Sequence, residues 1–378
     1  MQIGLGATLL ARGLEHHQLD GIGYYTLELA KCLPSFDCNW QPMVFGATSV
    51  AQIDLRVVHR LPRYSTAAFF SSLTGLGFAG HSALKRQIDI FHATDHHIPL
   101  LPGIPVLATM MDAIPLTHAE WASPQFRSFK NKLWLHASRW ADHVVTISDY
   151  AKTQIVEHFH IAEQKISVVP LGVAPRFYDR IDFLDRQAVH KSHDLQRSYF
   201  LCIGTLQPRK NIQRVIDAYQ CLPNVLRQAH DLVIVGRNGW GSDQLVQQLR
   251  QFSPESGVRW LGSIPDLDKR VLLQGATALV FPSLSEGFGL PVLEAFASQT
   301  PVITSNTTSL PEIANAAALL VDPYDTSAIA NAMQQLAESP SLASQLRTHG
   351  LARSRQYSWQ NCAKQTSEIY QRMLGRIK

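Results

Sequence analysis

The chain has 378 residues, of which 46% are hydrophobic and 17% charged, and its formal net charge is +4. Such a composition is typical of a globular protein and excludes an intrinsically disordered one. The mild charge argues against a dedicated nucleic-acid binder, which would carry clustered basic patches. At about 150 residues per domain, the length predicts two or three domains with well-packed cores.

The sequence lacks the patterns of a membrane span, a secretion signal and a metal site. No apolar run approaches the roughly 18–20 residues of a membrane span. The first ten residues have no basic segment and are typical of a buried strand. The five cysteines are scattered, without a Cys-x-x-Cys pair or a His/Cys cluster at zinc spacing. We therefore expect a cytoplasmic, reduced protein without a bound metal.

Short apolar runs alternate with amphipathic segments in the first half of the chain. The apolar runs predict strands at Gln2–Gly6, Gln41–Phe45, Ile88–His92, Val106–Thr109 and His143–Ile147. Helices are predicted between them, for example at Tyr24–Cys32 and Phe126–Trp140. This alternation is typical of a parallel sheet covered on both faces. Such sheets bind ligands at the carboxyl ends of their strands.

The alternation weakens at Val173–Arg197, where Pro175 precedes a polar stretch, and we interpret this region as a domain boundary. A second series follows. Its strands are predicted at Tyr199–Gly204, Asp231–Val235, Gly257–Leu261, Ala278–Phe281, Pro301–Thr304 and Ala317–Val321. Its helices are predicted at Asn211–Cys221, Ser242–Phe252, Asp266–Gly275, Leu290–Ser298, Ser309–Asn315 and Thr326–Glu338. The fold class is therefore α/β, with two doubly wound domains that face a central cleft, a usual place for a ligand.

The densest candidate site is Phe281–Phe296, where a strand is followed by a glycine-containing loop and a helix that opens at Leu290. Glycine lets a backbone approach a ligand closely, and the free amides of a helix start favour an anion such as phosphate. Glu286 and Glu294 flank this loop. Carboxylates beside a phosphate need a separate role, such as gripping sugar hydroxyls. The same sequence is also consistent with a plain strand-to-helix turn in which Glu294 lies on a solvated face.

A second candidate is Gly204–Ile212, which also joins a strand to a helix. Arg209 and Lys210 stand at the start of that helix, where cations oppose the macrodipole unless an anion lies between. The alternative is two solvent-facing basic residues. A third candidate is the turn with Gly21 and Gly23, which lacks the full spacing of a dinucleotide-binding fingerprint and is also consistent with a tight turn.

Two further segments place polar groups after buried strands. Asp112 follows one such strand and is either a site carboxylate or an ordinary turn residue. The segment Phe91–His97 contains three histidines. Because strand alternation would point His96 and His97 in different directions, we favour loop histidines near a cleft over a metal site.

Aromatic and basic residues are mixed in Phe126–Trp140. Such a helix either lies on a membrane surface or, more commonly, packs its apolar face on its own domain. The apolar stretch Ala67–Phe78 is either part of the core or an exposed surface for a lipid-linked acceptor.

Taken together, the segments resemble the retaining, GT-B-fold glycosyltransferases of family 4, also called glycosyl transferase group 1. The likeness covers most of the chain and is most specific in the second half. It rests on Gly21–Thr26, Val168–Val173, Gly204–Asn211, Gly236–Trp240, Pro282–Glu294, Pro301–Ser305, Leu310–Glu312, Val321–Pro323 and Tyr357–Trp359. The resemblance implies an N-terminal Rossmann-like domain on the acceptor side (1–180) and a nucleotide-sugar-binding domain (181–355). A last helix (356–378) would cross back to the first domain.

The resemblance also implies roles for single residues. Glu286 would hold hydroxyls of the donor sugar and Glu294 the ribose of the nucleotide. Lys210, with Arg209, would neutralise the leaving diphosphate. Backbone amides would bind the sugar or the diphosphate at Gly287, Phe288, Gly289 and Leu290, and the loop with Gly21 and Gly23 would approach the diphosphate. Ile264 belongs to the loop expected to touch the base.

Two positions depart from the family pattern. Thr205 stands where many members have an arginine, so Arg209 would take a larger share of the binding. Met111 precedes Asp112 where many relatives have His-Asp. Methionine cannot donate a hydrogen bond or shuttle a proton. Either Asp112 alone suffices, or His92 or His118 supplies the contact, or activity is impaired; we favour the first.

The function that this resemblance implies is a retaining, metal-independent hexosyltransferase with no cofactor. It would move a sugar, first of all mannose from GDP-mannose, to a glycan or lipid-linked acceptor in bacterial surface polysaccharides such as lipopolysaccharide, with peripheral contact at the inner membrane. The alternatives are a sugar-nucleotide epimerase, a phosphorylase with pyridoxal phosphate, and a non-catalytic nucleotide-sugar-binding subunit. The base, the sugar, the acceptor, the linkage and the oligomeric state do not follow from the sequence.

Overall fold

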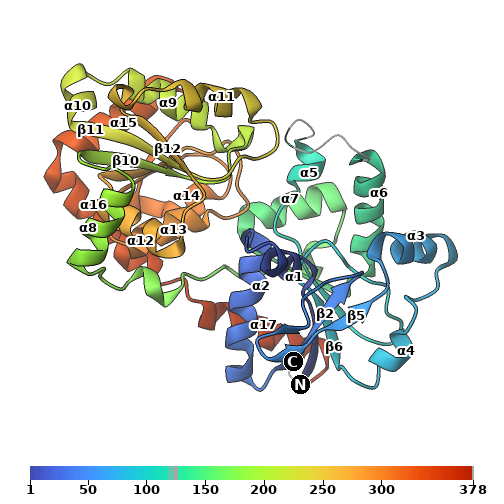
Figure 1. Ribbon diagram of the computed structural model, residues 1–378. Coiled ribbons are helices and arrows are strands. Elements are labelled where there is room, and N and C mark those ends of the chain that lie inside the picture. The colour runs from blue at the N-terminus through green and yellow to red at the C-terminus, as the bar shows by residue number, and fades with distance from the viewer. Residues whose placement is uncertain (119–120, 122–126, 377–378) are drawn as a thin grey trace. The chain divides into compact units, whose positions relative to one another are not determined.

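The computed structural model describes residues 1–118, 121 and 127–376, and the chain divides into two compact units (Figure 1). Within the described residues, unit 1 comprises 1–117, 127–172 and 358–376. Unit 2 comprises His118, Trp121 and 173–357. Each unit has its own parallel sheet. In the part of the chain that is described, no helix is both long and apolar enough to cross a bilayer.

Unit 1 contains a seven-stranded parallel sheet with the order β5-β2-β1-β6-β7-β8-β9. Its strands are β1 (Gln2–Gly6), β2 (Asn39–Phe45), β5 (His59–Leu61), β6 (Ile90–Ala93), β7 (Val106–Thr109), β8 (His143–Thr146) and β9 (Ile166–Val168), beside the short ribbon of β3 (Gln52–Ile53) and β4 (Arg56–Val57). The central strands are buried along their whole length, which explains why they are continuous apolar runs in the sequence.

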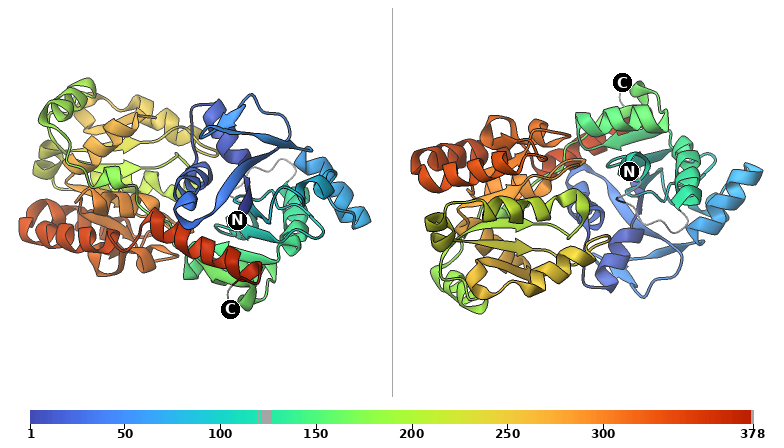
Figure 2. Two further views of the ribbon diagram at one scale, coloured as in Figure 1. Left: turned by 90° about the horizontal axis from the view of Figure 1, so that it is seen from below. Right: turned by 90° about the horizontal axis from the view of Figure 1, so that it is seen from above.

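The helices of unit 1 are α1 (Thr8–Glu15), α2 (Gly21–Cys32), α3 (Tyr64–Thr74), α4 (His81–Leu84), α5 (Ile114–Thr117), α6 (Arg127–Ala137), α7 (Asp149–Phe159) and α17 (Trp359–Met373). The last helix, α17, packs against α2, with the Tyr24 and Trp359 rings 5.9 Å apart in an edge-to-face contact. Figure 2 shows α17 beside these N-terminal elements, close to the start of the chain.

A buried polar chain fastens α17 to the sheet of unit 1. Tyr370 Oη lies 2.6 Å from His92 Nδ1, and His92 Nε2 lies 2.7 Å from Thr109 Oγ1. The Tyr25 hydroxyl continues this chain at 2.9 Å from Thr109 Oγ1. Burial lowers the pKa of His92 to about 3, so its ring is neutral at pH 7.

Unit 2 contains a six-stranded parallel sheet with the order β12-β11-β10-β13-β14-β15. Its strands are β10 (Ser198–Ile203), β11 (His230–Val235), β12 (Val258–Gly262), β13 (Ala278–Phe281), β14 (Val302–Ser305) and β15 (Leu319–Val321). Its helices are α8 (Phe183–Ser192), α9 (Ile212–Gln220), α10 (Asn224–Ala229), α11 (Asp243–Gln251), α12 (Asp266–Gly275), α13 (Leu290–Ala297), α14 (Leu310–Ala314), α15 (Thr326–Glu338) and α16 (Pro340–Ser354). Helices α9, α11 and α15 cover one face of the sheet, and α12 and α13 cover the other (Figure 1).

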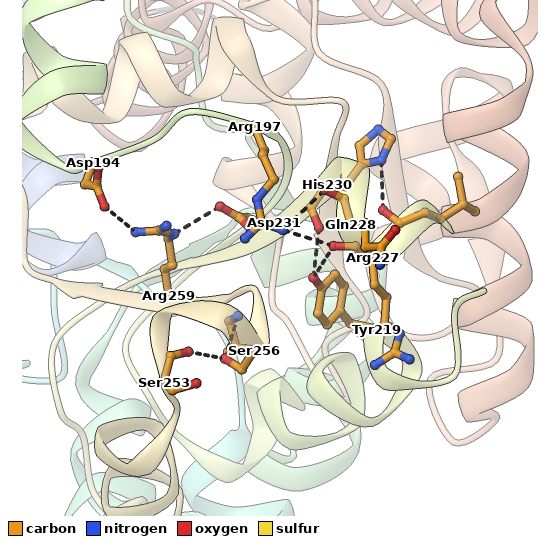
Figure 3. Close-up of polar contacts among 12 residues, drawn as sticks. Asp194, Arg197, Tyr219, Arg227, Gln228, His230, Asp231, Ser253, Ser256 and Arg259 are labelled. Atoms are coloured by element: carbon orange, nitrogen blue, oxygen red, sulfur yellow. Dashed lines mark hydrogen bonds and ion pairs between the residues drawn. The ribbon is translucent and has the colours of Figure 1, made fainter. Parts of the chain in front are cut away.

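An ion network joins strands β11 and β12 of unit 2 (Figure 3). The Asp231 side chain is only 1% exposed, and its Oδ1 and Oδ2 lie 2.7 Å from Arg197 Nη2 and 3.0 Å from Arg259 Nε. Asp194 extends the network at 3.4 Å from Arg259. Because Asp231 is buried between two cations, removal of its charge would take from both arginines their buried ion-pair partner.

The strands and helices predicted from the apolar pattern are present, with boundaries that differ by at most three residues at each end. For the helix predicted at Phe126–Trp140, the first residue lies outside the described residues. The polar region Val173–Arg197 is not irregular throughout, because Asp182 caps the N-terminus of α8 within it. This helix is rich in exposed charged residues and buries few apolar ones, such as Val189, so its sequence lacks a clear apolar pattern.

Candidate functional site

The candidate site of unit 2 lies at the point of the sheet where the order of successive strands reverses. From β10 the chain continues to β11 and β12 on one side, whereas β13, β14 and β15 extend the sheet on the other. The carboxyl ends of β10 and β13 are therefore adjacent, and each continues into a loop that reaches a helix. In open α/β sheets this crevice is the usual ligand site. The two strongest sequence candidates occupy these two loops.

The first loop forms a short 3₁₀ turn, Pro208–Lys210, before α9. Asn211 has a left-handed backbone and is buried, and its Nδ2 donates to the carbonyl oxygens of Pro282 at 3.0 Å and Pro323 at 2.6 Å. The backbone of Leu284 also donates to the carbonyl oxygen of Arg209 at 2.8 Å. These bonds tie together the loops that follow β10, β13 and β15, so the two cations of the first loop have fixed positions.

Both cations bind one carboxylate from the second loop. Arg209 Nη1 lies 2.8 Å from Glu286 Oε2, and Lys210 Nζ donates to Glu286 Oε1. Arg209 also donates to the carbonyl oxygen of Ser285 at 3.1 Å. The side chains of Glu286 and Lys210 are 10% and 12% exposed. The alternative of two solvent-facing basic residues is therefore wrong.

The two cations shift the titration of the carboxylate. Burial by itself raises the pKa of Glu286, but Arg209 and Lys210 outweigh it and lower that pKa to about 2. Burial lowers the pKa of Lys210, and Glu286 only partly opposes that shift. Arg209 and Lys210, whose side chains are 23% and 12% exposed, thus converge on one carboxylate. A pair of cations in such a place can also bind an anion, such as a phosphate.

The second loop leads into α13, whose first residue is Leu290. Gly289 has φ of 114°, and a Cβ there would lie 2.7 Å from the Leu310 side chain, so this turn requires glycine. Ser309 Oγ lies 2.9 Å from the carbonyl oxygens of both Glu286 and Phe288. The Ser309 hydroxyl therefore fixes the backbone of this loop. The first amides of α13 have no partner within the helix and can bind a ligand at its start.

Glu294 lies one turn into α13 and is only 5% exposed, so the alternative of a solvated face is wrong. Its Oε2 lies 2.5 Å from Lys269 Nζ of α12. The sequence pattern did not identify Lys269 or the bracing residue Ser309. Both lie outside the glycine-containing loops, and only the packing of α12 and α14 near α13 brings them to this site.

Other predicted donor-binding residues of unit 2 have less defined roles. Thr205 is half-buried directly after Gly204. Ile264 is half-buried in the loop between β12 and α12, next to Gly262, whose carbonyl oxygen accepts a 2.8 Å hydrogen bond from Gly236. Gly287 and Phe288 are buried in the second loop.

The predicted residues of unit 1 lie at the ends of its strands and at the start of α2. Asp20 caps α2 by accepting a 2.7 Å hydrogen bond from the amide of Gly23. A Cβ on Gly21 would meet nothing within 4 Å, so the backbone is open to close approach there. Asp112 Oδ1 accepts a hydrogen bond from the amide of Ile114 at 3.1 Å, which is the turn role considered for it.

The two histidines considered as substitutes for Met111 differ in accessibility. His92 is fully buried and both of its ring nitrogens have partners, so it cannot contact a sugar. His118 stacks on Trp121 with 3.8 Å between ring centroids. The directions predicted for His96 and His97 are wrong, because their ring centroids lie 4.3 Å apart after the strand has ended. Within the described ranges, no three His, Cys, Asp or Glu side chains are placed to hold a metal ion.

Comparisons with known proteins identify two family models that together span most of the chain. Residues 185–353 match the family described as "Glycosyl transferases group 1", and residues 19–177 match "Glycosyltransferase Family 4". The "O-antigen chain mannosyltransferase B" of Escherichia coli is 36% identical over 368 residues, which cover 94% of this chain and 96% of that protein.

A second relative and a solved structure give the same picture. The "O-antigen chain mannosyltransferase RfbU" of Salmonella typhimurium is 29% identical over 68% of this chain and 67% of its own length. Sucrose-phosphate synthase from Thermosynechococcus elongatus matches in structure with a TM-score of 0.78 and 18% identity, and 100% of each chain is covered. That likeness establishes the fold alone, two Rossmann-like α/β units of the GT-B type.

Proposed function

Since the chain belongs to the group 1 glycosyltransferases of family 4, we propose that it transfers mannose from GDP-mannose to a glycan of a bacterial surface polysaccharide. The observation that carries this proposal is the buried cluster of Arg209, Lys210 and Glu286 at the carboxyl ends of β10 and β13. Mannose and the polysaccharide rest on the names of the Escherichia coli and Salmonella relatives.

In the proposed reaction, the bond between C1 of the sugar and the diphosphate oxygen breaks, and a bond from C1 to the acceptor oxygen forms. The acceptor hydroxyl loses its proton to an oxygen of the departing diphosphate, so the products are the glycoside and the nucleoside diphosphate. Lys210 and Arg209 would stabilise the charge that develops on the leaving group. Glu286 would hold sugar hydroxyls, and Glu294 the ribose.

Retention of configuration and independence from metal are part of this proposal. Transfer on the face from which the diphosphate leaves would retain the anomeric configuration. The two cations and the first amides of α13 supply the positive charge that a divalent metal supplies elsewhere. Activity should therefore persist in excess EDTA, and proton NMR of the product should show the anomeric configuration of the donor. Loss of activity in EDTA that magnesium or manganese restores would contradict the first expectation.

The donor is tested by binding before activity. A thermal-shift panel of GDP, UDP, dTDP and ADP, alone and with their common sugars, should show the largest shift with GDP-mannose. A ligand at 100 times its dissociation constant stabilises the folded state by about 2.7 kcal/mol. Lys210→Met should abolish most of the shift, whereas Arg347→Met, a change in α16 of the same unit, should not. A larger shift with another nucleotide would contradict the choice of base.

Transfer also distinguishes the alternatives. A nucleotide-sugar epimerase would convert GDP-mannose without an acceptor, and a binding subunit would release no GDP under any condition. The proposed enzyme should release GDP only together with a glycosylated acceptor. Wild-type protein that binds GDP-mannose but transfers nothing to mannosyl acceptors would favour the non-catalytic alternative, to which Met111 gives its main support.

We further propose that unit 1 contacts an anionic membrane, where a lipid-linked acceptor would be anchored. Apolar side chains are exposed on α3, on the turn that follows it and on α6: Phe69, Phe70, Leu73, Leu76 and Phe129. The Phe69 and Phe129 rings lie 6.0 Å apart, so the two helices form one apolar patch. Large apolar patches mark interaction sites.

Charge is segregated along the segments that contain this patch. Residues 55–88 and 127–141 contain nine of the 34 Lys and Arg residues and none of the 30 Asp and Glu residues. The remainder of the chain is therefore acidic on balance, with 25 basic and 30 acidic side chains. An apolar patch on segments whose charged residues are all basic matches a bilayer with anionic headgroups, because each exposed cation near such a surface adds about 1 kcal/mol.

Vesicle sedimentation tests this contact. The protein should bind vesicles that contain phosphatidylglycerol and bind pure phosphatidylcholine far less. Phe69→Ser with Phe129→Ser, and separately Lys130→Glu with Lys132→Glu, should weaken binding about tenfold or more. Val225→Ser removes a more exposed apolar side chain from unit 2 and should have no effect. If both double variants bind vesicles as tightly as the wild type does, this surface is not the membrane contact.

A further inference from the structure

Glu294 of α13 is paired with a lysine that has no role in the reaction described above. Every residue from Val292 to Ala297 is buried, and Glu294 is the charged one among them. Glutamate is rarely buried unless it is paired. Lys269 of α12 provides the partner, with its Nζ 2.5 Å from Glu294 Oε2. The lysine side chain is itself only 25% exposed, so the pair is largely shielded from water.

This pair lies at the ligand edge of the sheet. In unit 2, α12 follows β12 and α13 follows β13, and both strands belong to one parallel sheet. Helices that follow parallel strands begin at the carboxyl ends of those strands, where open α/β sheets bind their ligands. Lys269 lies in the first turn of α12, and Glu294 lies one turn into α13. A pair that served only to join the two helices could lie anywhere along them, whereas this one lies at the ends that belong to the candidate site.

A buried aromatic ring limits the positions that the Lys269 ammonium can take. Its Nζ lies 5.1 Å from the centroid of the Phe177 ring, a favourable distance for a cation beside an aromatic face. Phe177 is fully buried in the short turn Pro175–Phe177, and its carbonyl oxygen accepts a 3.4 Å hydrogen bond from Ser298 Oγ at the end of α13. The ammonium therefore contacts both Glu294 and a ring that is tied to the helix of Glu294.

Polar bonds also attach α12 to the segment that precedes α8. Arg176 donates two hydrogen bonds to the carboxylate of Asp266, the first residue of α12, at 2.9 and 3.3 Å. Near the other end of the helix, Gln274 Nε2 donates to the carbonyl oxygen of Asp179 at 2.7 Å. A helix attached near both ends is hindered from turning about its axis, so the direction of Lys269 is set before any ligand arrives.

Lys269 leaves the carboxylate able to bind a ligand. A carboxylate has two oxygens with about four acceptor positions, and one ammonium occupies only part of them. The two neighbouring hydroxyls of a ribose are donors that suit the remaining positions. Removal of Lys269 would leave a buried charge without its countercharge, and the Glu294 side chain would lose the contact that orients it.

We infer that Lys269 is a positioning residue for ribose recognition. It holds the Glu294 carboxylate in the orientation that accepts hydrogen bonds from ribose hydroxyls, and so makes the site selective against nucleotides that lack these hydroxyls. A site built to bind hydroxyls rejects such analogues because its buried polar groups are then left unpaired. This inference rests on the proposed function, because the ribose belongs to the nucleotide donor.

Binding of GDP and of 2′,3′-dideoxy-GDP to the full-length protein, measured by calorimetry, tests this role. Loss of hydrogen bonds to a charged group predicts binding of the dideoxy analogue by the wild type that is weaker by about tenfold or more. Lys269→Met should weaken GDP binding by about tenfold and leave binding of the analogue unchanged, so the ratio of the two affinities decreases. Lys191→Met changes an exposed lysine of α8 and should keep the wild-type ratio.

A double-mutant cycle separates positioning from direct contact with the nucleotide. If Lys269 acts through Glu294, the variant Glu294→Gln and the double variant with Lys269→Met should have the same affinity ratio. A further decrease of the ratio in the double variant would place Lys269 on the ribose itself and overturn the positioning role.

The remaining outcomes separate this inference from the proposed function. Unchanged affinity of Lys269→Met for the dideoxy analogue shows that the variant is folded. A wild-type affinity ratio in Lys269→Met would overturn the inference, as would equal affinity of the wild-type protein for the two nucleotides. Both results leave GDP binding, and with it the proposed function, intact. If the wild-type protein binds neither nucleotide, the proposed function fails and the inference fails with it.

Discussion

Lys210 and Glu286 are 76 residues apart in the chain, yet their side chains form a buried ion pair where β10 and β13 end side by side. Arg209 binds the second oxygen of the same carboxylate. The two cations and the carboxylate come from two different loops. Hydrogen bonds from the Asn211 side chain and from the Leu284 backbone join these loops. The cluster is thus positioned before any ligand arrives, and its two cations are placed to meet an anion.

Replacement of the shared carboxylate should disable transfer. Glu286→Gln keeps the shape but removes the charge that orients both cations and, under the proposed function, the group that holds the donor sugar. Loss of one preorganised polar contact costs about a hundredfold or more in rate. We therefore expect a decrease of at least this size in kcat, measured by release of GDP with a mannosyl acceptor. Glu255→Gln alters an exposed carboxylate of the same unit and should leave kcat unchanged. Wild-type turnover by Glu286→Gln would remove Glu286 from the site.

The same carboxylate should make stability depend on pH in acid. Its pKa is about 2 in the folded protein, below the ordinary glutamate value of 4.5 that applies to the unfolded chain. A carboxyl group whose folded pKa is depressed stabilises the protein fully above the unfolded pKa. That contribution is lost as pH falls from about 4.5 towards 2. Urea unfolding of wild type and Glu286→Gln should therefore give free energies of unfolding that converge over this interval. A difference that stays constant would contradict the ion-pair assignment.

Asp231 should be important for the stability of unit 2 without touching the site. Asp231→Asn removes the buried charge between Arg197 and Arg259, which are themselves partly exposed. We expect a loss of about 2–3 kcal/mol in the free energy of unfolding, less than for a fully buried pair because water can reach both arginines. Asp185→Asn changes an exposed aspartate of α8 and is the matched control. Equal unfolding midpoints for the two variants would show that the network adds little.

The attachment of α17 to unit 1 should depend on one hydroxyl group. Tyr370→Phe leaves the buried Nδ1 of His92 without its 2.6 Å partner. An unsatisfied buried polar group costs about 1–3 kcal/mol, which should appear as a lower free energy of unfolding of unit 1 and faster hydrogen exchange in α17. Tyr324→Phe, a change at an exposed tyrosine of unit 2, should have no such effect. Unchanged exchange in Tyr370→Phe would show that apolar contacts alone hold α17.

The local sequence determined most of the α/β architecture of this protein. Continuous apolar runs such as Val106–Thr109 and Ala278–Phe281 are buried strands, because a covered parallel sheet hides both faces of each strand. The two glycine-containing loops were recognisable for the same local reason. Helices that bury few apolar residues were not predicted from this pattern, and α8 is the clearest case.

Contacts between distant segments were decided only by the tertiary structure. The strand order brings Lys210 to Glu286, and the packing of α12 near α13 pairs Glu294 with Lys269. Neither contact can be read from spacing along the chain. The neighbours His96 and His97 have their rings 4.3 Å apart because β6 ends before them, so the pleat of a strand no longer alternates their directions. A parallel sheet joins segments through long crossover connections, so the sequence supplies the loops while their neighbours depend on the order in which the strands assemble.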